Sequence, residues 1–117
     1  MSKFSFPKTS RILNRADFIR LAKSGNKIHS DCFIAAVSKS EYGHVRIGIT
    51  VTKKVGNAVV RNRIKRFVRE YFRLNRQKIT GSWDINIIAK KKVANLTSLQ
   101  TFKALQTIFE KTAMRIQ

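Results

Sequence analysis

The stretch GNAVVRNRIKRFVREYFRLNR, residues 56–76, decides how the rest of the chain is organised. Placed on a helix at ~100° per residue, it separates into two faces. One face is apolar and comprises Val60, Ile64, Phe67, Val68, Tyr71 and Phe72. The opposite face is cationic and comprises Lys65, Arg66, Arg69, Arg73 and Arg76, with Arg61 and Arg63 at the edges of the apolar face and Asn62 on the polar side between them. This pattern predicts an amphipathic helix whose apolar face is buried in a core.

The cationic face predicts a polyanionic partner. Like charges three or four residues apart on a helix repel each other, so the face has a stability cost that a polyanion would offset. A solvated helix face is the alternative. Solvated faces usually mix the two signs of charge, whereas this segment contains a single acid, Glu70. We therefore interpret the helix as a surface that binds nucleic acid.

Composition supports the same interpretation. The chain has 117 residues, which predicts one domain with one core. Its 25 basic and 6 acidic residues give a formal net charge of +19, a field that attracts nucleic acids, anionic membranes or acidic proteins. A helix that lies on a membrane exposes its apolar face, but here that face is needed for the core. Nucleic acid is therefore favoured, and no membrane partner is expected.

The predicted location is the cytoplasm. Cys32 is the single cysteine of the chain, so a disulfide framework and a cysteine zinc cluster are excluded, in keeping with a reducing compartment. The first residues, MSKFSFPKTSR, lack the apolar segment of a signal peptide. No apolar run approaches the length that spans a membrane.

The other elements follow from capping residues and apolar periodicity. A first helix should begin after Asn14 as the N-cap and run to about Ser24, and residues 1–11 form either a disordered tail or a basic arm that orders on RNA. Strands are expected at residues 32–37, 45–51 and 83–89, the first two paired antiparallel. The basic helix should begin after Asn57 and fray after Asn75. A last helix should follow a capping box of Thr97 and Gln100 and bury Leu99, Phe102, Leu105, Phe109, Ala113 and Ile116.

The residues do not indicate a catalytic centre in the protein. The six acids are scattered along the chain, whereas a nuclease that holds Mg²⁺ needs clustered carboxylates. Glu70 has Arg66 and Arg73 within reach for an ion pair. His29 and His44 have no third metal ligand near them in the sequence. We expect a protein that binds its partner without catalysing a reaction itself.

The stretch VTKKVGNAVVRNRIKRFVRE, residues 51–70, resembles the signature of the bacterial ribonuclease P protein component. The stretches FPKTSRILNRADF, RIGITV and WDINIIAKK fall where that family has similar ones, so the resemblance extends over nearly the whole chain. It implies an α/β fold, a two-layer α+β sandwich of one domain, residues 1–117. The family has a four-stranded sheet covered by helices, as in domain 2 of ribosomal protein S5, whereas the elements expected from the residues themselves follow in the order α-β-β-α-β-α. Its β-α-β crossover is left-handed, against the usual preference.

The resemblance also implies a function. The family binds a large catalytic RNA, and together they form an endonuclease that removes the 5′ leader of precursor tRNA. The chemistry belongs to Mg²⁺ held by that RNA, so no cofactor or metal on the protein and no protein partner is expected. By position, the RNA-binding residues are Lys53, Lys54, Arg61, Asn62, Arg63, Lys65, Arg66, Arg69 and Arg73.

The family has a second site, a cleft between the first helix and the sheet that holds the single-stranded leader. Phe18, Phe33 and Arg11 are the candidates here, because aromatic and basic side chains bind single strands by stacking and charge. Phe33 lies in an apolar run, so a core position is the favoured alternative for it. Ala22 and Ala36 occupy positions that are aromatic in some relatives, which predicts weaker stacking.

Two other functions stay open at this stage. A ribosomal or RNA-chaperone protein would share the basic surface but have no part in tRNA processing. A stand-alone protein nuclease would need carboxylates such as Asp17, Asp31 or Asp84, and their scatter in the sequence disfavours it.

Overall fold

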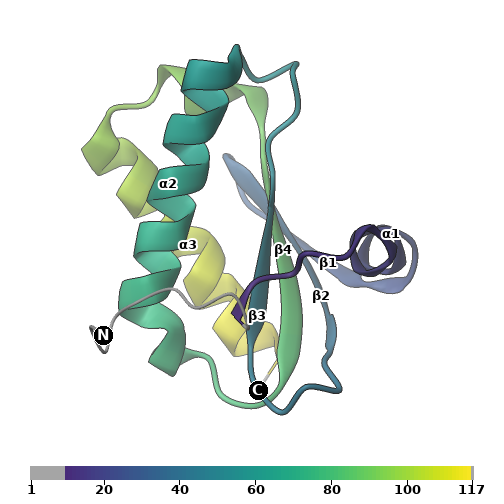
Figure 1. The fold of residues 1–117 in the computed structure, drawn as a ribbon. Helices are drawn as coiled ribbons and strands as arrows, with labels where there is room; N and C mark the ends of the chain where they lie inside the picture. Colours follow the sequence, from purple (N-terminus) through teal and green to yellow (C-terminus); the bar gives the residue numbers. More distant parts are fainter. Residues whose placement is uncertain (1–9, 117) are drawn as a thin grey trace, which may run out of the picture.

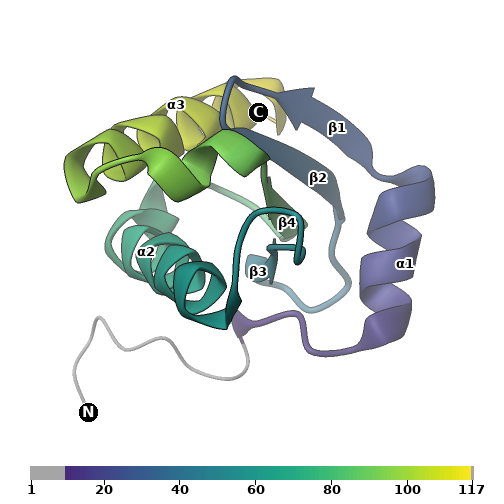
Figure 2. The ribbon, with the colours of Figure 1, turned by 90° about the horizontal axis from the view of Figure 1, so that it is seen from above.

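A four-stranded mixed sheet forms the middle of the computed structural model, which describes residues 10–116 (Figure 1). Helices α2 and α3 cover one face of the sheet and α1 lies against the other (Figure 2). The elements follow in the order α1 (Arg15–Ser24), β1 (Asn26–His29), β2 (Phe33–Lys39), β3 (Arg46–Thr50), α2 (Ala58–Asn75), the 3₁₀ turn η2 (Arg76–Lys78), β4 (Trp83–Ala89), the 3₁₀ turn η3 (Lys91–Asn95) and α3 (Ser98–Ile116). The predicted α+β fold is confirmed.

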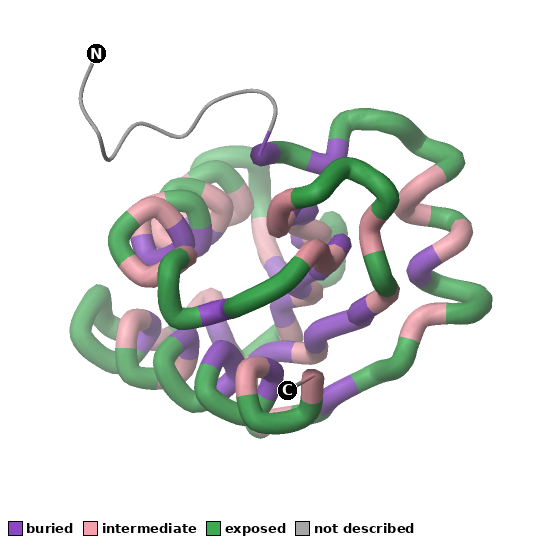
Figure 3. Tube along the Cα trace, turned by 90° about the horizontal axis from the view of Figure 1, so that it is seen from below, coloured by how far each residue is buried: buried purple, intermediate pink, exposed green. Residues whose placement is uncertain are grey.

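The main core lies between the sheet and the helices α2 and α3. The alternate strand positions that point to this side are apolar, and the inner faces of both helices meet them (Figure 3). The predicted apolar face of α2 is confirmed, since Ile64, Val68, Tyr71 and Phe72 are buried and Val60 and Phe67 pack against the core. The cationic side of α2 is thereby turned away from the sheet.

The segment β3-α2-β4 forms the predicted crossover between parallel neighbouring strands. Seen from α2 with the two strands pointing upward, β4 lies to the left of β3 (Figures 1 and 2), so the crossover is left-handed. The strand order across the sheet is β1-β2-β4-β3. Helix α2 packs over the β3 edge, and α3 packs over β1 and β2.

The predicted pairing of the first two strands is wrong. Strand β2 pairs antiparallel with β4, and β3 lies on the far side of β4. The residues between β2 and β3 have only two strand spacings to cross, about 10 Å, so their length is compatible with either arrangement. The sequence prediction also lacked β1, because Asn26–His29 buries Ile28 alone and shows no alternation.

Most predicted helix ends are confirmed. The side chain of Asn14 accepts a hydrogen bond from the Ala16 amide, and that of Asn57 accepts one from the Val60 amide. Thr97 and Gln100 form the reciprocal capping box. Leu99, however, is 65% exposed. The buried face of α3 runs through Thr101, Leu105 and Ile108, and at ~100° per residue Leu99 lies on the opposite side of the helix. Residues 1–9 of the predicted basic arm lie outside the described part of the chain.

Candidate nucleic-acid interface

The turn before α2 presents the first two predicted RNA-binding residues. Lys53 and Lys54 are both exposed in the turn that follows β3, and buried Val55 anchors this turn. Gly56 then lies so close to α2 that a Cβ there would come within 2.9 Å of Val60. A close-packed turn therefore holds these two lysines directly before the first helical turn.

The first three turns of α2 present the main group of cations. Arg66, Arg69 and Asn62 are exposed, and Lys65 is half-buried. Among residues 10–116, no carboxylate lies within salt-bridge distance of any of these cations. The helix therefore displays un-neutralised positive charge on the side that faces away from the core.

The two arginines at the edges of the apolar face are held differently. Arg61 and Arg63 are half-buried, and the Nε of each is buried without a hydrogen-bond partner in the described part of the chain. A terminal nitrogen of Arg63 donates to the carbonyl of Ala94 in η3, at 3.1 Å. The stems of these two side chains thus pack along the helix edges, as can happen for arginines beside a core.

The last turns of α2 are partly neutralised. Arg73, which the sequence placed in the RNA-binding set, forms an ion pair with Glu70. The hydrogen bond from Arg73 lowers the pKa of Glu70 below its ordinary value. Arg76 makes a long contact of 3.4 Å to the hydroxyl of Ser10. The un-neutralised charge is consequently concentrated toward the N-terminal half of the helix.

Two of the three residues predicted for the leader cleft lie together in the structure. Phe18, Arg11, Lys65 and Arg69 line one hollow of about 140 Å³, where α1, the segment before it, β3 and α2 meet. Phe18 lies directly on Gly48, where a Cβ would be 2.6 Å from the ring. The structure therefore joins the two predicted sites, the aromatic one and the cationic one, into one continuous surface.

Phe33 is not part of this hollow. Its side chain is fully buried among the core residues on the other face of the sheet, as the alternative interpretation of its apolar run predicted. Ala36 is buried beneath α1 next to Leu21, while Ala22 is exposed. The aromatic contribution to the cleft thus comes from Phe18.

A buried ion network beneath α1 was missed by the sequence prediction. Arg46 donates from Nε and from a terminal nitrogen to the two carboxylate oxygens of Asp84, both at 2.8 Å. Arg20 of α1 donates to Asp84 at 2.7 Å and to the hydroxyl of Ser38 at 2.9 Å. Asp17 of α1 accepts from Arg46 at 3.2 Å. The network ties α1 to both β3 and β4.

The electrostatics of this network keep it ionised. Burial by itself would raise the pKa of Asp84, but the hydrogen bonds and charges of Arg46 and Arg20 outweigh it, and the pKa lies below its ordinary value. The hydrogen bond to Asp84 raises the pKa of Arg46. In the sequence, Arg46 occupies a polar position of an alternating strand, a pattern that is typical of a side chain facing solvent. A signal for burial was absent because α1, far away in the sequence, covers it.

No metal site was found in the described part of the chain, since no three His, Cys, Asp or Glu side chains of residues 10–116 gather closely enough to hold an ion. None of its helices is long and apolar enough to cross a membrane.

Fold and surface together define a small, strongly basic α+β protein that gathers un-neutralised cations on the helix at one edge of its sheet. Comparison with known proteins identifies its family. A family model described as Ribonuclease P matches residues 6–113. The ribonuclease P protein component of Desulforapulum autotrophicum is 54% identical over 111 residues, which cover 95% of each chain. That of Desulfosudis oleivorans is 48% identical over 113 residues, which cover 97% of this chain and 93% of the relative.

A solved structure agrees with these matches. The RNase P protein of Staphylococcus aureus superposes with a TM-score of 0.81 at 36% sequence identity, covering 86% of this chain and 93% of the other. The chain belongs to the ribonuclease P protein component family.

Proposed function

We propose that this chain acts as the protein subunit of ribonuclease P. In this role it binds the catalytic RNA subunit and the 5′ leader of precursor tRNA, and it assists the endonucleolytic cut that makes the mature 5′ end. Family membership supports this role. The observation that carries it is the un-neutralised cationic surface of the turn before α2 and the first turns of α2, formed by Lys53, Lys54, Arg61, Asn62, Arg63, Lys65, Arg66 and Arg69.

The physical task of that surface is to reduce repulsion between phosphates. Guanidinium groups suit bidentate contact with phosphate oxygens, and the exposed amide of Asn62 can both donate and accept hydrogen bonds. Arg73 has a smaller part in this proposal, because Glu70 already neutralises it. The surface would dock on the RNA subunit, whose bound Mg²⁺ supplies the cleavage chemistry.

The leader would lie in the hollow beside Phe18. A base of the single strand can stack on the ring, and Arg11, Lys65 and Arg69 on the same hollow can contact its phosphates. Stacking and charge discriminate little between sequences, which suits a protein that must accept many different leaders. With one aromatic side chain in the hollow, we expect the charged contacts to dominate.

Leader removal at low Mg²⁺ tests the proposal. The RNA subunit should cut precursor tRNA markedly faster with this protein than without it, because the protein's cations replace part of the screening that Mg²⁺ provides. Equal rates with and without the protein would reject the assignment.

Two alternative functions make different predictions. A ribosomal or RNA-chaperone protein would enrich ribosomal RNA from a lysate in preference to the ribonuclease P RNA. A stand-alone nuclease would cut RNA without an RNA subunit and would lose that activity when Asp17, Asp31 or Asp84 is changed. Asp17 and Asp84 are already engaged by Arg46, which favours a structural role for both.

A further inference from the structure

A second hollow opens beside β3, at the far end of α2 from the turn that carries Lys53 and Lys54. Its volume is about 390 Å³, within the range of ligand pockets, about 300–1,000 Å³. It lies between the end of α2 and the loop from β2 to β3, and it is lined by Ser10, Gly43, His44, Val45, Arg76, Ile79 and Gly81. None of these side chains is a carboxylate, so the guanidinium of Arg76 gives the hollow a positive charge.

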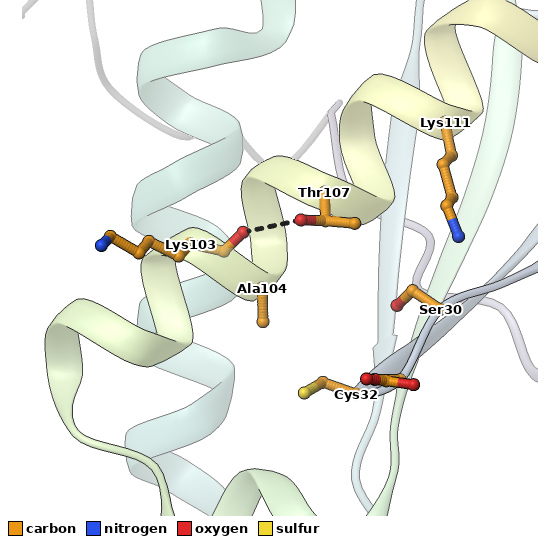
Figure 4. A pocket seen from close by; sticks show the side chains of 7 residues that line it. Ser30, Cys32, Lys103, Ala104, Thr107 and Lys111 are labelled. Carbon is orange, nitrogen blue, oxygen red and sulfur yellow. Dashed lines mark hydrogen bonds between the residues drawn. The ribbon is translucent and has the colours of Figure 1, made fainter.

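A hollow of similar size elsewhere on the molecule has a different character. Figure 4 shows this other hollow, of about 400 Å³, between α3 and the β1–β2 hairpin. Asp31 lines it together with Lys103 and Lys111, so a carboxylate offsets part of its positive charge. The hollow at the end of α2 has no such acid in its lining and suits an anion better.

Arg76 keeps its charge available to a ligand. Within residues 10–116 it forms no ion pair, in contrast to Arg73 one turn earlier, which pairs with Glu70. Its hydrogen bond to the hydroxyl of Ser10, at 3.4 Å, is longer than the usual length of about 2.9–3.0 Å. A guanidinium has five N–H donors, so Arg76 retains donors for a phosphate group.

The opposite rim of the hollow, the loop from β2 to β3, is held in place by hydrogen bonds. The amide of Ser40 donates to the carbonyl of Ser82 at 3.0 Å, and the amide of Tyr42 donates to the hydroxyl of Ser40 at 3.1 Å. The Nδ1 of His44 lies 2.9 Å from the carbonyl of Tyr42. A Cβ on Gly43 would meet no atom within 4 Å, so this rim is open as well as ordered. Less conformational freedom is lost when a ligand binds to an ordered rim.

The two hollows beside β3 follow one another along α2. Ile47 lines the first, which also contains Phe18, and Val45 lines the second. Lys65 and Arg69 line the first hollow, and Arg76 lines the second. At ~100° per residue these three cations lie within about 40° of one another around the helix axis. Arg76 lies about 10 Å beyond Arg69 along that axis, so one side of the helix supplies cations to both hollows.

We propose that the hollow at the end of α2 binds a backbone phosphate of the 5′ leader of precursor tRNA, upstream of the nucleotides that lie beside Phe18. Consecutive residues of one segment border the two hollows, Arg11 the first and Ser10 the second. The inference rests on the proposed function. There the RNA subunit, which makes the cut, docks on the N-terminal half of α2, so the end of the leader next to the cut lies there and its 5′ part extends toward Arg76.

Leader length tests this site in the reconstituted holoenzyme. Affinity is measured for mature tRNA and for precursor tRNAs whose leaders are shortened one nucleotide at a time from the 5′ end. Arg76→Gln removes the charge of the second hollow, and Arg76→Lys keeps it. Lys78→Gln is the matched control, because Lys78 is exposed in the same 3₁₀ turn and does not line this hollow. Circular dichroism verifies that each variant is folded.

With the wild type, affinity should rise a second time when the leader is long enough to pass the first hollow and reach Arg76. This second gain should be lost in Arg76→Gln and kept in Arg76→Lys and in the control, whereas precursors with short leaders should bind all four holoenzymes alike. For long leaders, the slope of log affinity against log salt should fall by about 0.7 in Arg76→Gln. Over a fourfold rise in salt, the wild type then loses about 2–3-fold more affinity than this variant.

Two results overturn the inference and leave the proposed function intact. One is a wild-type affinity that stops rising once the leader fills the first hollow. The other is an Arg76→Gln variant that weakens the binding of short and long leaders equally. If the wild-type protein improves the binding of precursor tRNA by the RNA subunit at no leader length, the proposed function itself is rejected.

Discussion

Changing Asp84 to Asn should destabilise the fold strongly, because it removes the charge at the centre of the buried ion network. The Asp84 side chain is 1% exposed and that of Arg46 is 9% exposed. Without the carboxylate, the guanidinium of Arg46 stays buried with only Asp17 as a charged partner. Breaking a buried pair in this way costs about 3–5 kcal/mol, a large part of the 5–15 kcal/mol typical of a whole domain.

Urea denaturation measures this loss. For a slope of about 2 kcal/mol per molar urea, the midpoint should fall by about 1.5–2.5 M at an unchanged slope. Asp17→Asn is the matched control, because it removes an acid of the same network whose side chain is 21% exposed and whose contacts are longer, at 3.2 and 3.6 Å. A loss of about 1 kcal/mol is expected there.

A double variant separates charge from packing. In Arg46→Met/Asp84→Leu, both buried charges are replaced by apolar groups, which is often close to neutral for stability. Arg20 is 38% exposed and can turn to solvent, so most of the stability lost in Asp84→Asn should return. If Asp84→Asn costs no more than Asp17→Asn, or if the double variant is as unstable as Asp84→Asn, the network does not hold α1 as described.

Three further measurements follow from the structure. The pKa of Asp84 is lowered in the folded state, so its carboxylate contributes fully to stability above the unfolded-state pKa of about 3.9, and this contribution is lost as the pH falls through the folded-state pKa. The difference in unfolding free energy between the wild type and Asp84→Asn should therefore shrink in acid. A constant difference down to pH 2 would contradict the network. Gly48→Ala should displace the Phe18 ring and cost about 1–3 kcal/mol of stability. It should also weaken the binding of precursor tRNA more than the binding of mature tRNA. Equal effects on the two RNAs would show that Phe18 is not part of the leader site. Arg66→Ala should shallow the salt dependence of RNA affinity by about one ion with an unchanged melting temperature, and an unchanged slope would make Arg66 part of a solvated face.

Local features were predictable from the sequence, and long-range ones were not. The helix beginning after Asn57 has its cap, its apolar face and its cations within one continuous segment, so the pattern alone defined it. The partner of a strand is a different matter. The sequence of β2 suits pairing with β3 as well as with β4, and what excludes β3 is the crossover through α2, which places β4 between them.

Burial of charged residues shows the same limit. Arg46 alternates with apolar residues in β3, a pattern typical of a solvent-facing side chain, yet α1 covers it together with Asp84. The family resemblance placed Phe18 and Phe33 in the same cleft, but successive strand positions point to opposite faces. The register of β2 puts Phe33 with Ala35 in the main core and Ala36 beneath α1.

The positions of the few acids explain where the positive field is strongest. Asp17 and Asp84 neutralise the arginines beneath α1, and Glu70 neutralises Arg73 near the end of α2. Within residues 10–116, no acid forms an ion pair with the first three turns of α2. A chain with uniformly spread positive charge would attract RNA to every side, whereas local pairing at α1 and at the end of α2 leaves un-neutralised charge on the N-terminal half of α2, where the proposed function places the RNA. If the proposed function is correct, the same acids that stabilise the fold also orient the protein toward its RNA partner.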